Sequence, residues 1–446
     1  MDSSVKAPAT SFVPPPAELV GWEGGLPREG WRRTFASLGN PDFRLLWSSM
    51  LFSFTGIQMS FTAQGFLTFD LTGTATSLGV VSLGWGIPLL VLSLVGGVAA
   101  DRLHKRWLMV VCHSALAASS LVTAVLIQTG VIAVWQIFLL ALVTGTVFAF
   151  NVPARQAWIP ELVGEKNLMN AVALNSSAFT LTGIVGPAAA GSLIAVPFIG
   201  LTGVYYLMAG CFAMVVLVLL RIPGGAPVAS EGRPHPYREL LDGLSYIRRH
   251  RVLPILLLMG FVPIVLGMPY RTFFPVFQEE VYGVGSVGLG VMGAVMAVGA
   301  LVGSLGVASL SNTSRRSLIQ LAGGVGFGIA LVFFAAAPTL PLGLVALVFV
   351  GLTANGFWAL NNTMVLGSTD PKYYGRVMSV YMLSWSVMPF ATLPESALAD
   401  QFGVQTMVAG VGGLLVVALL AISLLVPGHR RLREDEASRA QSRPIR

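Results

Sequence analysis

Few residues of this sequence could do chemistry inside an apolar environment. Arg271 lies in the apolar stretch "GMPYRTFFPVF", and Glu395 lies in "TLPESALADQFG". A charge in such surroundings is costly unless an opposite charge compensates it. The segments that hold these two residues, and the groups that could pair with them, are therefore the first features to establish.

The elements that hold them are long apolar segments. Only 11% of the residues are charged, whereas a soluble domain carries about 25%. Runs of about 20 apolar residues, enough to cross a bilayer, predict twelve transmembrane helices in two sets of six. They are expected at residues 43–68, 76–99, 107–127, 132–153, 168–195, 201–221, 253–276, 284–309, 317–337, 341–366, 375–397 and 404–426. The predicted fold class is an all-α integral membrane protein with two pseudo-symmetric six-helix bundles.

The segments outside these helices define the domain organisation. Residues 1–41 are rich in Pro, Gly and polar groups, so they predict a disordered tail and not a cleaved signal peptide. The predicted bundles are residues 42–222 and 253–427, joined by a linker at 223–252 and followed by a tail at 428–446. The linker predicts an amphipathic helix whose apolar stripe is Leu240, Leu241, Leu244 and Ile247.

The cations predict the orientation in the membrane. If both termini are cytoplasmic, 26 of the 27 Lys and Arg residues fall on the inner side, and the exception is Arg271. Cytoplasmic loops of membrane proteins hold such an excess of cations. We therefore expect both termini inside.

Depth along the helices suggests partners for Arg271. At about 1.5 Å per residue, Arg271 and Glu395 both lie about 27–30 Å from the inner surface. We expect them to pair, directly or through Asp70 or Glu280, as an outer gate or as the element that couples transport to an ion. The alternative is that Arg271 extends to the outer lipid headgroups.

Uncharged amides predict where a polar cavity could lie, because such side chains are costly against lipid. They gather on the first, fourth and tenth predicted helices, as Gln58, Gln64, Asn151, Asn355, Asn361 and Asn362. The aromatic residues Phe54, Phe61, Trp358 and Tyr381 could line the same cavity. The alternative is that the amides only join helices.

Several function classes are disfavoured by the sequence. The patterns G-x-x-x-x-G-K-[ST], H-E-x-x-H and G-x-S-x-G are absent, so we expect no enzyme. Cys112 and Cys211 fall inside predicted helices without metal-ligand spacing, so we expect neither a metal nor a cofactor. The cations form no basic stripe with aromatics, so nucleic acid is not an expected partner.

Two motifs carry family information. After the second predicted helix, "GGVAADRLHKR" contains Asp101, Arg102 and Arg106, where an anion could lie against a helix N-terminus. The fifth predicted helix contains "TGIVGPAAAG", with Gly183, Gly186, Pro187 and Gly191. Small residues let helices approach closely, and the eighth helix has the same feature at Gly299 and Gly303. The two interpretations are a flexible contact between the halves and ordinary packing.

These motifs resemble those of the major facilitator superfamily, in its bacterial exporter branch with enterobactin-type siderophore exporters and macrolide efflux proteins. The resemblance covers about residues 40–428. It implies that Asp101, Arg102 and Arg106 latch the cytoplasmic side in the outward-open state. An arginine typical of proton-coupled drug exporters is replaced by Ala141, which disfavours proton coupling by that route.

The expected function is therefore secondary active export of an amphipathic small molecule, of the drug or siderophore class, by alternating access. The expected location is the bacterial plasma membrane, with membrane lipid and a small-molecule substrate as partners, protons as a candidate coupling ion, and a monomeric state. The alternatives are an importer or lipid flippase on the same fold, or a transport-inactive membrane sensor or anchor.

Overall fold

The computed structural model describes residues 36–225, 236–250, 252–309 and 316–425, and within these ranges every regular element is a helix. A short 3-10 helix, η1 (Ala36–Gly39), precedes the first long helix. The predicted N-terminal tail therefore ends earlier than residue 41. Ser37 is buried, and its hydroxyl donates a hydrogen bond of 3.0 Å to the Asn167 carbonyl.

The N-terminal bundle consists of α2 (Pro41–Thr72), α3 (Ala75–Arg102), α4 (Lys105–Gln128), α5 (Val134–Ile194) and α6 (Gly200–Leu219). The Asn40 side chain begins α2 by accepting hydrogen bonds from the Asp42 and Phe43 amides. A kink at Gly164, where φ is 69°, divides α5 into two spans, Val134–Gly164 and Asn167–Ile194. Glycine adopts this backbone angle without a side-chain clash.

The C-terminal bundle combines continuous long helices with two spans that contain breaks. Its elements are α8 (Leu253–Leu266), η2 (Met268–Phe273), α9 (Phe274–Val276), η3 (Phe277–Val281), α10 (Ser286–Ser309), α11 (Arg316–Ala336), α12 (Leu340–Gly367), η4 (Pro371–Tyr373), α13 (Tyr374–Leu383), η5 (Ser384–Val387), α14 (Met388–Phe402) and α15 (Val404–Leu425). The spans Leu253–Val281 and Tyr374–Phe402 each change between helix types along their length. These changes reorient the side chains that follow the breaks in both spans.

Eleven helices within the described ranges are long and apolar enough to cross a membrane. The segment that the sequence predicts as the first transmembrane helix is α2, which is helical over 32 residues but is not among the eleven. The composition of α2 explains this, because Ser49, Ser53, Gln58 and Thr68 face the interior of the bundle. The count of twelve membrane helices stays a prediction.

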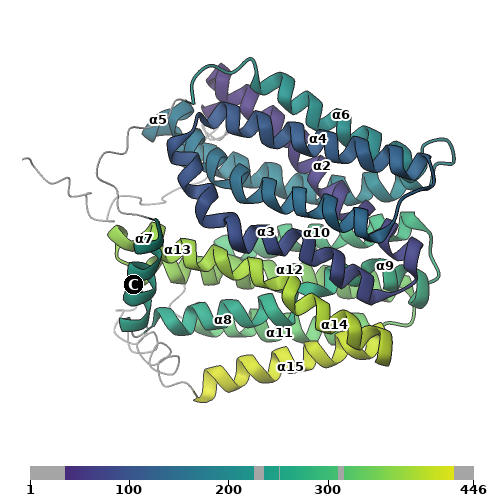
Figure 1. Ribbon diagram of the computed structural model, residues 1–446. Coiled ribbons are helices and arrows are strands. Elements are labelled where there is room, and N and C mark those ends of the chain that lie inside the picture. Colours follow the sequence, from purple (N-terminus) through teal and green to yellow (C-terminus); the bar gives the residue numbers. More distant parts are fainter. Residues whose placement is uncertain (1–35, 226–235, 251, 310–315, 426–446) are drawn as a thin grey trace, which may run out of the picture.

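The two bundles lie side by side in Figure 1, with α4 and α6 along one edge and α11 and α15 along the other. Between these edges α3 packs against α14, and α5 packs against α10. One apolar core fills the N-terminal bundle and a second fills the C-terminal bundle. Each half therefore has a core of its own.

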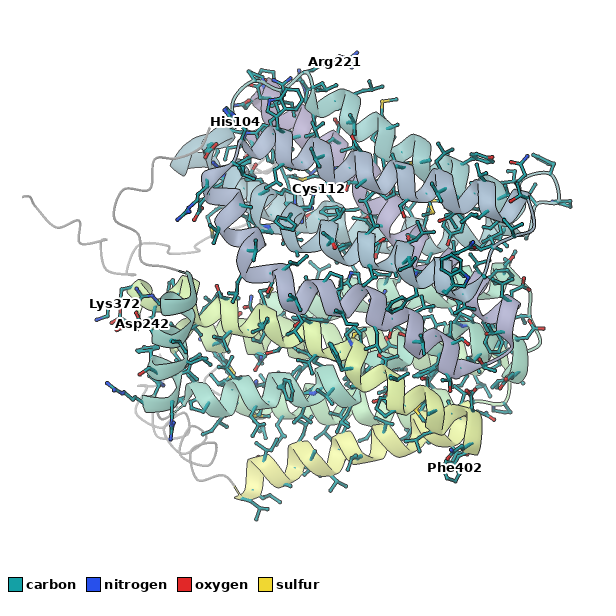
Figure 2. All side chains as sticks on the ribbon, viewed as in Figure 1. His104, Cys112, Arg221, Asp242, Lys372 and Phe402 are labelled. Carbon is teal, nitrogen blue, oxygen red and sulfur yellow. The ribbon has the colours of Figure 1, made fainter. Side chains whose placement is uncertain are left out.

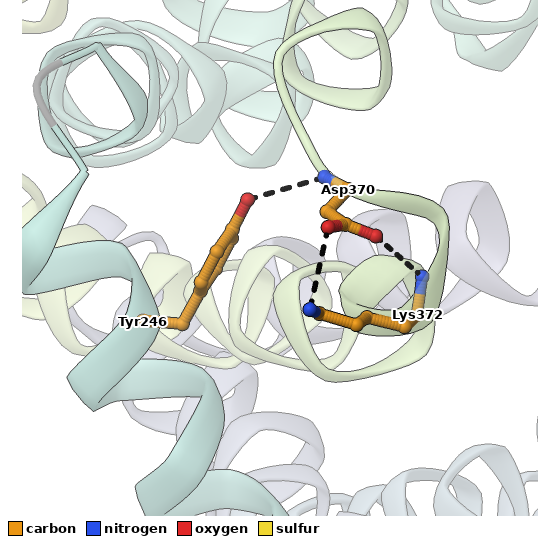
Figure 3. Close-up of polar contacts among 3 residues, drawn as sticks. All are labelled: Tyr246, Asp370 and Lys372. Carbon is orange, nitrogen blue, oxygen red and sulfur yellow. Dashed lines mark hydrogen bonds and ion pairs between the residues drawn. The ribbon is translucent and has the colours of Figure 1, made fainter.

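The linker helix α7 (Pro236–Arg249) packs on the loop between α12 and α13. The Tyr246 and Tyr373 rings stack at 4.0 Å, and the Tyr246 hydroxyl accepts a hydrogen bond of 3.1 Å from the Asp370 amide, as Figure 3 shows. Lys372 pairs with the Asp370 carboxylate at 3.5 Å. The linker is therefore attached to the C-terminal bundle.

The face of α7 that packs differs from the predicted apolar stripe. Ile247 is buried, whereas Leu241 and Leu244 are exposed, and the Leu240 side chain lies outside the described part. The buried face is instead centred on Gly243, where an added Cβ would lie 3.0 Å from the Arg376 Cβ. Tertiary contacts therefore bury the face of α7 that holds Gly243 and Ile247, and they leave the face with Leu241 and Leu244 exposed.

The glycines of α10 pack inside the C-terminal bundle. An added Cβ at Gly299 would clash with the Val348 carbonyl, and one at Gly303 with the Leu352 carbonyl, both on α12. The interpretation of these two glycines as a contact between the halves is therefore corrected: they let α10 and α12 approach within one bundle. Gly191 and Gly290 are the glycines that meet across the bundles.

Replacing Gly299 by Ala (G299A) should lower the melting temperature of the purified protein in detergent. The new methyl group has no room against the α12 backbone, and such overpacking costs about 1–3 kcal/mol. The matched control is Gly210→Ala on α6, where nothing lies within 4 Å of the added Cβ. Equal melting temperatures of the two variants, measured by scanning fluorimetry, would contradict the packing described here.

Candidate functional site

The two bundles meet closely at the end opposite α7. In Figure 2, His104, Asp242 and Lys372 lie toward the α7 end, and Phe402 lies toward the opposite end. At the opposite end Phe69, Ala75 and Leu78 from the N-terminal bundle join the apolar core of the C-terminal bundle. The opposite end is therefore closed by apolar packing between the two halves.

Glycines and prolines bring the helices of the two halves together. An added Cβ at Gly86 of α3 would lie 2.6 Å from Pro389 of α14. One at Gly290 of α10 would lie 2.7 Å from the Pro187 carbonyl of α5. Side chains larger than hydrogen would separate the halves here, so these positions are the contact surface between the bundles.

A carboxylate connects the halves at the same end. Asp400 of α14 accepts hydrogen bonds from the Ala75 amide at 2.7 Å and the Thr76 amide at 2.8 Å, and from the Thr76 hydroxyl. The first amides of a helix have no partner within the helix, and a negative charge is favourable there. Thr74 at the start of α3 supplies no side-chain cap of its own. Asp400 therefore caps α3 from the other bundle.

The predicted outer gate is only partly assembled in this structure. Glu395 is buried at 7% exposure, and its Oε1 has no hydrogen-bond partner in the described ranges. Arg271 lies on η2, next to α14, but its side chain is exposed, and among the described residues no ion pair joins it to Glu395. The break from α-helix to η2 explains this, because it changes the direction of the side chain at a given depth.

The two other predicted gate acids lie at the surface of the same end. Asp70 is exposed and lines a crevice of about 480 Å³ with Pro275, Gln278 and Glu279. Glu280 is also exposed. The sequence assigns Asp400 no role, because its cap depends on a helix that is far away in the chain.

The predicted cytoplasmic gate makes its described contacts inside one bundle. The Arg106 guanidinium donates a hydrogen bond of 2.6 Å to the Leu220 carbonyl at the end of α6. Lys105, which was not a predicted gate residue, forms an ion pair of 2.7 Å with Glu161 of α5. Asp101 and Arg102 end α3, and Arg102 is exposed. Arg106 thus joins helices of the N-terminal half, and the expected latch of the outward-open state stays a prediction.

The amides divide into structural and available groups. Asn361 is fully buried, accepting a hydrogen bond from Gln320 at 2.5 Å and donating one to the Tyr381 hydroxyl at 3.2 Å. Gln58 is buried against Gly183 and Gly186, which leave room for its side chain. These two amides join helices within their bundles.

A second internal network surrounds His113 of α4. Its Nδ1 lies 2.8 Å from the Met109 carbonyl, and its Nε2 lies 2.9 Å from the Ser53 hydroxyl. The Met109 carbonyl can only accept, so Nδ1 carries the proton of that bond, while the Ser53 hydroxyl can accept from or donate to Nε2. The predicted cavity residue Asn151 is buried beside it, its amide nitrogen 3.4 Å from Nδ1.

The remaining predicted cavity amides are more accessible. Gln64 and Phe61 line a crevice of about 520 Å³ among α2, α4, α5 and α6. Asn355 is exposed, and its amide donates to the Gly351 carbonyl at 3.3 Å. Asn362 is half-buried, and its Oδ1 has no hydrogen-bond partner in the described ranges.

Aromatic rings form one cluster in each half. Phe61, Trp85 and Phe148 lie within 6.3 Å of one another in the N-terminal bundle. In the C-terminal bundle the Trp358 ring lies 4.9 Å from Trp385 and 6.1 Å from Tyr381. These clusters supply the apolar surface that small-molecule sites typically have.

The two helical bundles close against each other at one end, and their inner helices carry polar and aromatic side chains. This arrangement is that of a membrane transporter. A family model described as transmembrane secretion effector matches residues 32–444. The chain therefore belongs to this family, within the major facilitator superfamily.

Several relatives of this chain are efflux proteins. Macrolide efflux protein A of Streptococcus pyogenes is 24% identical, over 87% of this chain and 97% of the relative. The multidrug efflux pump Tap of Mycolicibacterium fortuitum is 29% identical, over 86% and 95%. The enterobactin exporter EntS of Escherichia coli is 26% identical, over 84% and 86%. The chain is thus a secondary active exporter and not an enzyme, and neither the importer, the flippase nor the sensor alternative is favoured.

Solved structures support the fold. A single-residue mutant of the nucleoside transporter NupG matches with a TM-score of 0.70 at 16% identity, covering 85% of this chain and 99% of that one. The D-xylose-proton symporter also has a TM-score of 0.70, at 13% identity, covering 87% and 99%. At these identities the likeness concerns the fold alone.

Replacing Asp400 by Ala (D400A) should make the closed end open more often. A helix cap is worth about 0.5–2 kcal/mol, so the open fraction should rise about 2- to 30-fold. The readout is the rate at which a membrane-impermeant maleimide, added from the predicted outer side, labels a cysteine placed at Ser396. Ser396 is fully buried, and the free cysteines Cys112 and Cys211 are first replaced by alanine.

The matched control is Gln405→Ala, which removes a hydrogen bond to the Ala335 carbonyl within the C-terminal bundle. It should leave the labelling rate unchanged. A D400A rate equal to that of the parent would show that Asp400 does not hold the halves together.

Proposed function

We propose that this exporter moves an amphipathic small molecule, of the drug or siderophore class, out of a bacterial cell by alternating access. The observation that carries the proposal is the closure of one end by contacts between two separately packed bundles. Breaking the Asp400 cap and the glycine contacts would open that end without unfolding either core. The names of the efflux relatives, which concern macrolides, multiple drugs and enterobactin, support the substrate class.

We also propose twelve membrane helices with both termini in the cytoplasm, in a monomer of the plasma membrane. Arg248 and Arg249 belong to α7, and Lys372 lies toward the same end in Figure 2, whereas Asp400 is two residues from Phe402 at the opposite end. Cations are enriched on the cytoplasmic side of membrane proteins. The α7 end would then be cytoplasmic, and the structure closed toward the outside.

The proposed substrate path runs between the aromatic clusters. Trp358 and Asn362 are four residues apart on α12 and therefore share a face. The Trp358 Nε1 and the Asn362 Oδ1 both lack a hydrogen-bond partner in the described ranges. Such groups can orient an apolar substrate through one donor and one acceptor. Gln64 and Asn355 are further candidates for lining the path, and the substrate would also contact the Phe61 ring.

Glu395 is the proposed coupling residue. An ionised carboxylate without a partner is costly to bury, so a proton would bind here when the outer end is closed and leave when it opens. Arg271, on the neighbouring η2, would become its partner in the open state. Asp70 and Glu280 stay candidates for the same gate.

Expression of the protein in a bacterial host that lacks its own exporters should lower the accumulation of amphipathic drugs several-fold. Addition of a proton uncoupler should restore the accumulation. The compounds to measure are a macrolide, a cationic dye and a catecholate siderophore. If the protein is present in the membrane and the accumulation of all three compounds is unchanged, the proposal is contradicted.

Replacing Glu395 by Gln (E395Q) should abolish the part of the efflux that the uncoupler inhibits, while leaving the melting temperature unchanged. The control is Glu279→Gln, at an exposed acid of the same end. A double-mutant cycle with Arg271→Ala and Glu395→Ala tests the pair. Additive effects on efflux would exclude direct coupling between the two residues.

A further inference from the structure

Arg155 has a position that the cation pattern did not anticipate. The sequence placed it in a cytoplasmic loop, but the structure places it within the span Val134–Gly164. It precedes the kink at Gly164 by nine residues, or about 13 Å of helix. Arg155 is therefore a cation inside the N-terminal bundle.

The guanidinium of Arg155 has an aromatic partner but no anionic one among the described residues. Its central carbon lies 4.6 Å from the centroid of the Phe54 ring. Its Nε is buried without a hydrogen-bond partner, and no ion pair of Arg155 occurs in the described ranges. Lys105 and Arg106 of the same bundle instead contact Glu161 and the Leu220 carbonyl.

In the described part of the bundle no acid forms an ion pair with Arg155, and Glu161 of the same helix pairs with Lys105 instead. His113 bonds to the Met109 carbonyl and the Ser53 hydroxyl, and an imidazole is neutral or cationic, so it supplies no negative charge. The acids of α2, Asp42 and Asp70, are close to its two ends, and α4 and α6 contain no acid. A contact with an aromatic ring compensates a buried cation only in part.

The surroundings of Arg155 continue onto an accessible aromatic surface. The Phe54 ring packs edge-on against Phe179 at 5.4 Å. Phe179 is 52% exposed, and Asn175, one turn before it, has a buried Oδ1 without a partner in the described ranges. Arg155 itself is only partly buried. A ligand on Phe179 could therefore reach the guanidinium.

We propose that Arg155 binds an anionic group of the exported molecule, while the Phe54 and Phe179 rings contact its apolar body. The substrate class would then be aromatic or apolar acids, such as carboxylates. A guanidinium can donate two parallel hydrogen bonds to such a group. This inference rests on the proposed function, since it presumes that the molecule enters between the bundles.

The test uses a matched pair of probes, 1-naphthoate and its neutral amide 1-naphthamide, which share one ring system. Binding of each labelled probe to the full-length protein in lipid nanodiscs is measured by equilibrium dialysis, with empty nanodiscs as the blank. The parent protein should bind 1-naphthoate more tightly than 1-naphthamide. Arg155→Gln should raise the Kd for 1-naphthoate about tenfold or more and leave the Kd for 1-naphthamide within about twofold.

Two further variants complete the design. Arg155→Lys, which keeps the charge but loses the paired donors, should fall between the parent and Arg155→Gln. Arg221→Gln, at an exposed arginine beyond α6, should bind both probes as the parent does. Retained 1-naphthamide binding also shows that the Arg155 variants are folded.

Two results would overturn the inference. One is that the parent protein does not prefer 1-naphthoate to 1-naphthamide. The other is that Arg155→Gln weakens both probes equally, which would make Arg155 a structural residue. Neither result affects the export assay with whole cells, so a failure here is distinct from a failure of the proposed function.

Discussion

The contact between the Asp400 carboxylate and the first turn of α3 organises the arrangement of the two bundles. The amides of Ala75 and Thr76 need partners that their own helix cannot supply, and Asp400 supplies them from the other half. Around this cap, Phe69, Ala75 and Leu78 enter the core of the C-terminal bundle. A small set of contacts thus joins two cores that are otherwise packed separately. Such a connection can be broken and remade while both bundles stay folded, as alternating access demands.

Polar groups inside the bundles differ in whether the protein satisfies them. Asn361 with Tyr381, His113 with Ser53, and Lys105 with Glu161 have partners and hold helices together. A second set contains buried atoms that lack a partner within the described ranges. They include atoms of Arg155, Trp358, Asn362 and Glu395. Because an unpaired buried polar group is costly, the second set is where a substrate or a proton would gain most by binding.

The long helices could be predicted from the sequence, and in the structure they begin and end within a few residues of the expected positions, α4 at Lys105–Gln128 for example. The span Val134–Gly164 is an exception. It runs beyond its expected end, and Arg155 therefore lies in a helix where a loop was expected. The pairing of Arg271 with Glu395 was predicted from depth alone. Helix rise determines depth, but the direction of a side chain depends on every local change of helix type, and η2 lies at Arg271.

The sequence by itself determined that this is a polytopic helical membrane protein with an exporter's motifs. Insertion into a bilayer depends on hydropathy, segment length and the distribution of cations, and all three are properties of the sequence. Only the tertiary structure decided which polar residues are structural and which are free to act. Asp400 and Arg155 acquire their roles from α3 and Phe54, which are remote from them in the sequence. Hydrogen bonds and ring contacts depend on the rotation of one helix against another, and that rotation is set by packing across the whole bundle.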